Sequence, residues 1–222
     1  ARIGCEYGKD RYQILTEKYS ILPEEVTTDL DNTLREITQD LFSGVPRWRS
    51  PHLLYNVGAA VNVAASSMYS VALDENIYNI NDGLAGNALV AEMAVTNILA
   101  KLARLDTTPY GVFTFGGTGT NLYAIKIGTR KAQPNSGKEG IAGNIKVMVT
   151  EDAHFSHAVS VDWLGIGTNN IETIKLNADR TSNLEDAEKK ARQILESGFY
   201  LSTIIVNGGT TYSHTIDDIE SF

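Results

Sequence analysis

Apolar residues recur along this chain at two different periods, and the change between them separates a helical first part from a mixed second part. After the acidic opening at 23–25, apolar side chains follow one another at three- and four-residue steps, which is the spacing of one helix face. They are Val26, Leu30, Leu34, Ile37 and Leu41. The pattern predicts an amphipathic helix that ends near Gly44.

Two more helices are expected before residue 110. The stretch 57–73 is rich in alanine, serine and valine, a composition that suits a helix packed closely against its neighbours. Gly83 and Gly86 precede another long helical pattern, for which we predict one buried face. That face is formed by Leu89, Met93, Ile98, Leu102 and Leu105.

From Tyr110 onward, short apolar runs alternate with helical patterns. The runs 145–149, 171–176 and 204–206 are predicted strands. Strands that alternate with helices are typical of a mostly parallel sheet with helices on both faces. The predicted fold class is therefore α/β.

Turn and capping signals set the limits of the later elements. The polar segment 133–140 is predicted to be a surface loop within one domain. Ser182–Glu185 has a capping-box pattern that opens a helix through Leu195, and Gly198 closes it. The acidic segment 217–220 is expected to begin a further helix.

A glycine-rich turn at residues 113–122 is the strongest candidate for a binding site. Gly116 and Gly117 allow a tight turn, and the free N–H groups at the start of the following helix then face whatever lies in that turn. A phosphate group fits such a position. The turn lacks the lysine of a P-loop and the spacing of a dinucleotide fold, so the sequence points to another phosphate ligand.

Two other polar loops follow predicted strands. Residues 150–156 read Thr-Glu-Asp-Ala-His-Phe-Ser, and residues 207–211 read Asn-Gly-Gly-Thr-Thr. Open α/β sheets bind ligands at the loops beyond the carboxyl ends of their parallel strands. The two loops and the glycine turn are therefore expected to meet at one site.

In order and spacing, these three segments resemble the group II pyridoxal-phosphate-dependent amino acid decarboxylases, of the glutamate and aromatic amino acid type. The likeness extends upstream to Ser50–Asn56, to 76–78 and to Glu92. The resemblance implies a fold type I, aminotransferase-like large domain that is incomplete in this chain. It also implies pyridoxal 5'-phosphate as the cofactor.

The resemblance assigns roles to individual residues. Gly117 and Thr118 would hold the cofactor phosphate, and His154 would stack on the pyridine ring as the catalytic residue. A hydroxyl from Thr210 or Thr211 would lie near the ring oxygen. Asn56 would contact the substrate carboxylate, and no residue is assigned to a metal.

Each assignment has a structural alternative. His154 is equally readable as a loop histidine bonded to nearby backbone, Thr118 as a helix N-cap, and the Thr210–Thr211 turn as one that satisfies its own backbone. The family commonly has glutamate where this chain has Gly119, and glycine where it has His214. His157 is predicted to lie on a helix surface.

Two groups that the family needs are missing from the sequence. Its Schiff-base lysine, found in a His-Lys pair, and the aspartate that pairs with the pyridine nitrogen both follow the Gly-Thr-Thr turn, and no His-Lys pair exists here. We therefore expect an amino-terminal part of a longer enzyme: a helical extension and connecting segment at 1–56, and part of the cofactor-binding large domain at 57–222. The rest would come from a C-terminal portion, as a second chain or a missing segment.

Three functions remain open at this point. The first is a decarboxylase that removes the α-carboxylate of an acidic or aromatic amino acid by way of an external aldimine, in a complete unit that forms a homodimer. The second is a carbon–carbon lyase on the same scaffold. The third is a non-catalytic structural or regulatory subunit, because a fold does not determine a function.

Composition narrows the class of partner. The 222 residues are 42% hydrophobic, enough for a substantial core, and carry a formal net charge of −8. No basic cluster with interleaved aromatics is present, so neither nucleic acid nor an anionic membrane surface is expected as a partner. The single Cys5 suits a reducing compartment, and no apolar run has the length of a membrane span, so we expect a cytoplasmic protein.

Overall fold

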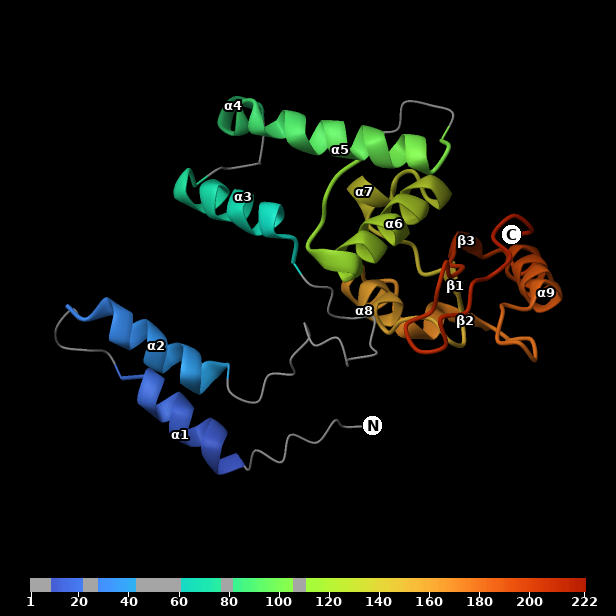
Figure 1. The fold of residues 1–222 in the computed structure, drawn as a ribbon. Coiled ribbons are helices and arrows are strands. Elements are labelled where there is room, and N and C mark those ends of the chain that lie inside the picture. The colour runs from blue at the N-terminus through green and yellow to red at the C-terminus, as the bar shows by residue number, and fades with distance from the viewer. Residues whose placement is uncertain (1–8, 22–27, 43–60, 77–81, 106–110) are drawn as a thin grey trace. The chain divides into compact units, whose positions relative to one another are not determined.

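The computed structural model describes residues 9–21, 28–42, 61–76, 82–105 and 111–222. Internal contacts divide the chain into two compact units, Ala1–Val63 and Ala64–Phe222. Figure 1 shows the described helices and strands as labelled ribbons.

Helices dominate the first half of the described chain, and all three described strands lie in the second half. The helices are α1 (Lys9–Tyr19), α2 (Leu30–Leu41), α3 (Val63–Asp74), α4 (Asp82–Ala85), α5 (Ala88–Leu102), α6 (Gly116–Ala132), α7 (Ser136–Glu139), α8 (Ser156–Trp163) and α9 (Leu184–Glu196). A 3₁₀ turn, η1, spans Thr168–Asn170. The strands are β1 (Ile145–Thr150), β2 (Ile171–Ile174) and β3 (Tyr200–Ile204).

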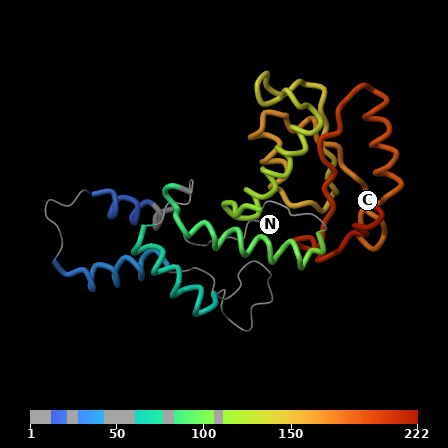
Figure 2. The backbone as a smooth tube through the Cα atoms, turned by 90° about the horizontal axis from the view of Figure 1, so that it is seen from above, coloured from blue at the N-terminus to red at the C-terminus, as the bar shows by residue number. Residues whose placement is uncertain are grey.

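The three strands form a parallel sheet in the order β2-β1-β3. In the register, Val147 of β1 lies opposite Ile171 of β2, and Ile145 of β1 lies opposite Tyr200 of β3. Helices connect the parallel strands, as parallel pairing requires. Figure 2 shows α6 and α9 on opposite sides of the strands. The predicted parallel α/β arrangement is confirmed.

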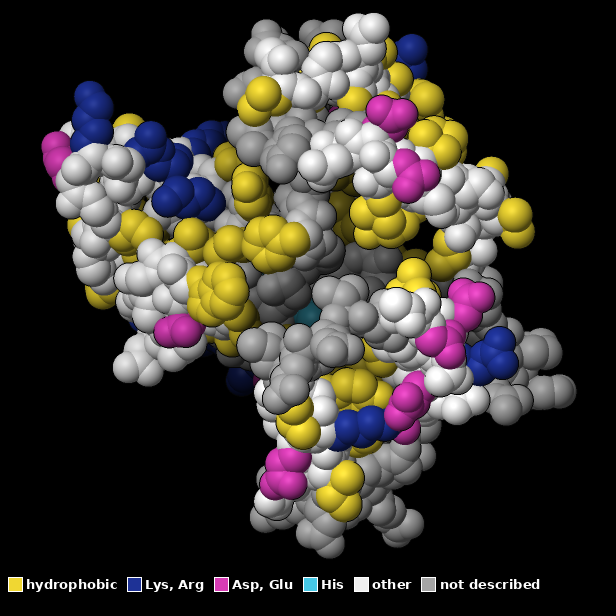
Figure 3. Space-filling view, turned by 90° about the vertical axis from the view of Figure 1, so that its left-hand side faces the viewer, with side chains coloured by type: hydrophobic (Ala, Val, Ile, Leu, Met, Phe, Trp, Pro, Cys, Tyr) yellow, Lys and Arg dark blue, Asp and Glu magenta, His cyan; other side chains and the backbone are white. Residues whose placement is uncertain are grey.

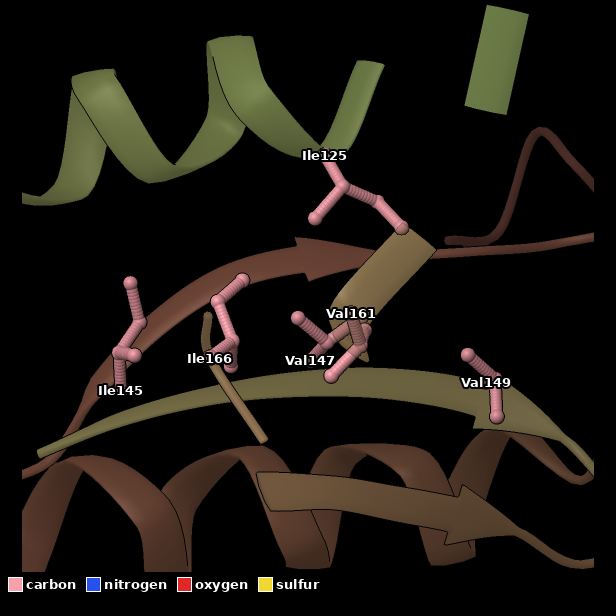
Figure 4. Packing of buried hydrophobic residues seen from close by; sticks show 6 residues of the cluster. All are labelled: Ile125, Ile145, Val147, Val149, Val161 and Ile166. Atoms are coloured by element: carbon pink, nitrogen blue, oxygen red, sulfur yellow. The ribbon is translucent and has the colours of Figure 1, made fainter. Parts of the chain in front are cut away.

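Each face of β1 packs into its own apolar cluster. On one face, Ile145, Val147 and Val149 meet Ile125 of α6 and side chains from α8 and the turn after it (Figure 4). On the other face, Met148 meets Ile174 and the apolar side of α9. A strand buried on both faces reads as a continuous apolar run, which is why 145–149 was recognisable in the sequence.

The earlier helices expose much of their apolar surface. No residue of α2 or α3 is buried among those whose burial is described, and in α5 only Ala100 is buried. The predicted buried face of α5 is therefore wrong for the chain by itself, since Met93 is 54% exposed and Leu102 is 75% exposed. Apolar side chains exposed on one face of the molecule appear in yellow in Figure 3.

A close approach between α6 and β3 occurs at Gly128. A Cβ atom at this position would lie 2.3 Å from Thr203 Oγ1 and 2.6 Å from the Ser202 carbonyl oxygen. Both distances are too short for real contacts, so only glycine lets the helix lie this near the strand.

Two element boundaries differ from the sequence predictions. The N-cap of α9 is Asn183, whose side chain accepts a hydrogen bond from Asp186 N, so the capping pair lies one residue later than the predicted box. Residues 217–220 do not begin a helix: Ile216 bridges to Gly208, and turns follow it. The closing role of Gly198 is confirmed by its φ of 77° directly after the helix.

Candidate functional site

Two loops leave the same edge of the sheet. Because β1 and β3 are parallel neighbours, the segments that follow Thr150 and Ile204 begin side by side. A hydrogen bond of 2.9 Å from Asn207 Nδ2 to Thr150 Oγ1 joins them at their start. The predicted meeting of the two polar loops is thus present in the structure.

The glycine turn forms the start of α6. Gly116 has a φ of 80°, and its N–H donates to the Thr114 carbonyl at 2.8 Å. No side chain caps the helix, and nothing lies within 4 Å of a Cβ built on Gly116 or Gly117. The next N–H groups, at Gly117 and Thr118, have no intrahelical carbonyl to bind, so they form an open set of donors at the positive end of a 17-residue helix.

Threonine hydroxyls fix the shape of this turn. Thr114 Oγ1 lies 2.7 Å from Thr120 Oγ1 and also donates to the Gly116 carbonyl at 3.0 Å. The Thr118 side chain is half-buried, and its hydroxyl has no partner within the described part of the chain. The turn is therefore braced by neighbouring hydroxyls, while the Thr118 hydroxyl takes no part in that bracing.

His154 is tied to both neighbouring helices. Its Nδ1 lies 2.8 Å from Ser156 Oγ and accepts from Ser156 N at 3.2 Å, so the ring caps the start of α8. Ser156 Oγ in turn accepts from Asn121 Nδ2 of α6 at 2.8 Å. This connects the imidazole to the helix that begins at the glycine turn, and α6 and α8 pack side by side (Figure 1).

The structural alternative for His154 is therefore also real, and the two readings are compatible. The backbone contact uses Nδ1 alone. The other ring nitrogen, Nε2, takes no part in these contacts with Ser156. The ring is half-buried, and its centroid lies 4.2 Å from that of Phe155.

Thr210 and Thr211 differ in what surrounds them. Thr210 is buried, and its hydroxyl contacts Ser213 Oγ and accepts from Thr215 N at 3.3 Å. Its backbone also pairs with Thr215, so this residue closes its own turn. The Thr211 side chain is half-buried.

Sequence reasoning missed a carboxylate that joins three loops. Asp152, after β1, accepts hydrogen bonds from Arg180 Nη2 at 2.6 Å and from Ser213 Oγ at 3.0 Å. Arg180 lies between β2 and α9, and Ser213 follows Thr210. The Arg180 guanidinium holds the pKa of Asp152 below its ordinary value, with a smaller contribution from Ser213. No local pattern predicts these contacts, because the partners are 28 and 61 residues away from Asp152.

A second carboxylate, that of Asp217, is 5% exposed and holds the loop after β3. Its Oδ2 accepts from Asn207 N and its Oδ1 from Ser182 N, both at 2.7 Å. Paired backbone donors make the buried position of this acidic side chain tolerable.

His157 is buried, so its predicted place on a helix surface is wrong. It is 5% exposed, and its Nδ1 has no hydrogen-bond partner in the described structure. Burial lowers the pKa of the His157 imidazole, and the neighbouring His154 lowers it further.

The two departures from the family pattern have local structural consequences. A Cβ at Gly119 would lie 3.1 Å from the Phe115 ring, which occupies the space that a side chain would need. His214 adopts a positive φ of 58°, the region that glycine enters at least cost. Asn56 lies outside the described residues, so its expected substrate contact stays a prediction.

The described ranges offer neither a membrane-spanning helix nor a cluster of metal-binding side chains. No helix there is long and apolar enough to cross a bilayer. No group of three or more histidine, cysteine or acidic side chains is placed to hold a metal ion in those same ranges.

Comparison with known proteins supports the resemblance read from the motifs. No protein-family model matches the chain. The acidic amino acid decarboxylase GADL1 of Bos taurus is 25% identical over 112 residues, which cover 50% of this chain and 22% of that protein. The L-2,4-diaminobutyrate decarboxylase of Rhizobium meliloti (strain 1021) is 26% identical over 132 residues, or 60% of this chain and 26% of that protein.

Among solved structures, the Oryza sativa TDC with PLP and tryptamine superposes with a TM-score of 0.82 at 19% identity. The superposition covers 94% of this chain and 45% of that one. The resemblance to group II decarboxylases and the fold type I class are thus confirmed. The chain spans about a quarter of the curated relatives named here and less than half of this structural neighbour.

Proposed function

We propose that this chain supplies the phosphate-binding turn and the ring-facing histidine of a pyridoxal-phosphate-dependent amino acid decarboxylase. The observation that carries the proposal is the link between the open start of α6 and His154, through Asn121 and Ser156. A phosphate site and an aromatic side chain on separate loops are joined by two hydrogen bonds.

The residues present fit the cofactor. Among the described residues, nothing lies within 4 Å of a Cβ built on Gly116 or Gly117, and no side chain caps the helix that starts there. Backbone donors at a helix N-terminus are suited to a dianionic phosphate. When bound, pyridoxal phosphate supplies an electron sink for the bond that breaks next to the amino acid nitrogen.

The role of this chain's own residues is to position the cofactor and to orient its ring. Gly117 N, Thr118 N and Thr118 Oγ1 would hold the phosphate, and His154 would lie against the pyridine ring and keep its orientation. Thr211 or Thr210 would present a hydroxyl near the ring oxygen. Thr211 is the better candidate, because the Thr210 hydroxyl already serves the turn at 213–215.

We propose that the Schiff-base lysine and the aspartate for the pyridine nitrogen belong to a C-terminal portion, and that the complete unit is a homodimer. The exposed apolar side chains of α3 and α5 support further contacts, since patches of this kind mark interfaces. Light scattering of the complete protein measures its oligomeric state.

Cofactor binding by the complete protein tests the site. We expect Thr118→Val to weaken pyridoxal phosphate binding by about tenfold or more, because a hydrogen bond to a charged group contributes about 1.5–3 kcal/mol. The affinity is measured from the absorbance of bound cofactor during titration. Inorganic phosphate should compete with the cofactor.

Thr129→Val is the matched control. It makes the same change on the same helix, where the hydroxyl contacts Ser202 Oγ instead of the open turn. Equal affinities in the two variants would contradict the phosphate assignment.

The reaction is tested separately. Carbon dioxide release from a panel of acidic, aromatic and diamino acids is expected for a decarboxylase, in line with the names of the relatives. Bound cofactor with no carbon dioxide from any of them would favour the carbon–carbon lyase. Failure to bind the cofactor at all would leave a structural or regulatory subunit.

A further inference from the structure

Two donors converge on one nitrogen of His154. The Ser156 N–H donates to Nδ1 at 3.2 Å, and Ser156 Oγ lies 2.8 Å from the same atom. A backbone N–H is always a donor, so this long contact favours an Nδ1 that presents its lone pair, and the shorter Ser156 Oγ contact adds to that preference. In a neutral imidazole the proton then resides on Nε2.

Asn121 fixes the direction of the second bond. Its Nδ2 donates to Ser156 Oγ at 2.8 Å, so the Ser156 hydroxyl hydrogen is free to point at His154 Nδ1. With the amide reversed, the hydroxyl hydrogen would go to Asn121, and two lone pairs would face each other at 2.8 Å. The three groups therefore form a relay with one consistent direction.

Burial makes this relay costly to break. Ser156 is fully buried, and its carbonyl already accepts from Ser160 Oγ at 2.7 Å. A buried hydroxyl that loses its hydrogen-bond partners destabilises the fold, because water cannot reach it to replace them. The relay also begins one helical turn after Gly117, so the imidazole and the glycine turn are attached to the same segment of α6.

We propose that Asn121 and Ser156 are positioning residues that hold His154 in its Nε2-protonated tautomer. The inference rests on the proposed function only in that this ring is the one assigned to the cofactor. In this tautomer Nε2 donates a hydrogen bond and cannot accept one, which restricts the groups that can approach the ring edge to acceptors.

The test reads the tautomer directly. In protein labelled with ¹⁵N at histidine, long-range proton–nitrogen spectra distinguish a protonated from an unprotonated ring nitrogen, and His154→Gln identifies the His154 signals. We expect a single neutral tautomer with the proton on Nε2. A proton on Nδ1, or an average of both tautomers, would overturn the proposal.

Two variants test the positioning role. Asn121→Ala and Ser156→Ala should each convert the single tautomer into a mixture, and Ser202→Ala should leave it unchanged. Ser202 is a suitable control because its hydroxyl also bonds to a side chain of α6, that of Thr129. A wild-type tautomer pattern in both Asn121→Ala and Ser156→Ala would mean that the backbone amide alone sets the proton, and would overturn the role of these side chains.

Cofactor titration of the same proteins separates the two proposals. We expect Asn121→Ala to weaken pyridoxal phosphate binding by about fivefold, the equivalent of one neutral hydrogen bond. An Nε2-protonated ring in a protein that binds no cofactor would contradict the proposed function and support the relay. Bound cofactor with the proton on Nδ1 would contradict the relay and support the proposed function.

Discussion

The sheet region and the early helices both contain apolar residues, but they bury them to very different extents. Every residue of β1 except Lys146 is buried, whereas α2 and α3 have no buried residue where burial is described. An apolar sequence indicates that a surface tends to be buried. Whether it is buried depends on which strands and helices pack against it. β1 has a strand on each side and a helix layer on each face.

The helices lack such cover within the described chain. Apolar side chains of α3 such as Met68, Tyr69 and Leu73 are each more than half exposed. A helix that is apolar around most of its circumference is normally buried by neighbouring elements. The comparison therefore predicts that equal substitutions in the two regions have unequal effects on stability.

The largest contrast is expected between two methionines. Met148→Ala, at a fully buried position between β1 and α9, should lower the free energy of unfolding by about 3 kcal/mol through lost transfer energy and a cavity. Met68→Ala, at a side chain that is 64% exposed, should change it by less than about 0.5 kcal/mol. Urea unfolding followed by circular dichroism measures both, and equal effects would abolish the distinction.

A smaller contrast is expected between two aspartates. Asp217→Ala leaves the N–H groups of Ser182 and Asn207 without their acceptor in a buried position, so we expect a loss of about 2–3 kcal/mol. Asp40→Ala removes contacts with Lys18 and Tyr19 at the surface between α1 and α2. Surface ion pairs contribute little, so the second variant should unfold at nearly the wild-type urea concentration. Indistinguishable midpoints for wild type and Asp217→Ala would contradict this reading.

The smallest effect concerns pH. Arg180→Gln should cost less than about 1 kcal/mol, because the Arg180 side chain is 55% exposed and its pair with Asp152 is screened by solvent. The Asp152 pKa is lowered in the folded state, so the pair stabilises the fold above the ordinary value of 3.8 and loses this effect as the pH falls through the lowered value.

Urea midpoints of wild type and Arg180→Gln should therefore differ above pH 3.8 and converge as the pH falls through the lowered pKa of Asp152. A difference that grows on acidification would contradict the assignment. Lys18→Gln is the matched control in the helical region, because Lys18 forms an exposed pair with Glu36 and Asp40.

Local patterns predicted the elements that are buried on both faces or closed by glycine. The run at 145–149 shows its strand because both faces are apolar, and Gly198 ends α9 because a positive φ favours glycine. The N-cap of α9 lies one residue after the predicted one, because Ser182 and Asn183 are both good N-cap residues. The backbone conformation, which the local pattern does not reveal, places Asn183 at the cap.

The site was predictable in its parts, whereas its connections were not. The glycine turn and His154 are visible as motifs, but the bond between Asn121 and Ser156 joins residues 35 positions apart. His157 was misplaced because α8 is eight residues long, too short for its periodicity to distinguish a buried face. Asp217 resembled a helix start because aspartate is common in the first turn of a helix. In the structure the same residue type serves as a buried acceptor for two backbone N–H groups.

The contact at Gly128 extends the proposed site well beyond the residues assigned to the cofactor. Three helical turns separate it from the glycine bend, yet any larger residue there would lift the whole rod of α6 off β3. The shift would tilt Thr118 and Asn121 together, without changing any residue of the proposed phosphate-binding turn. Substitution of Gly128 is therefore expected to weaken the proposed cofactor binding from a position three helical turns away from the turn itself.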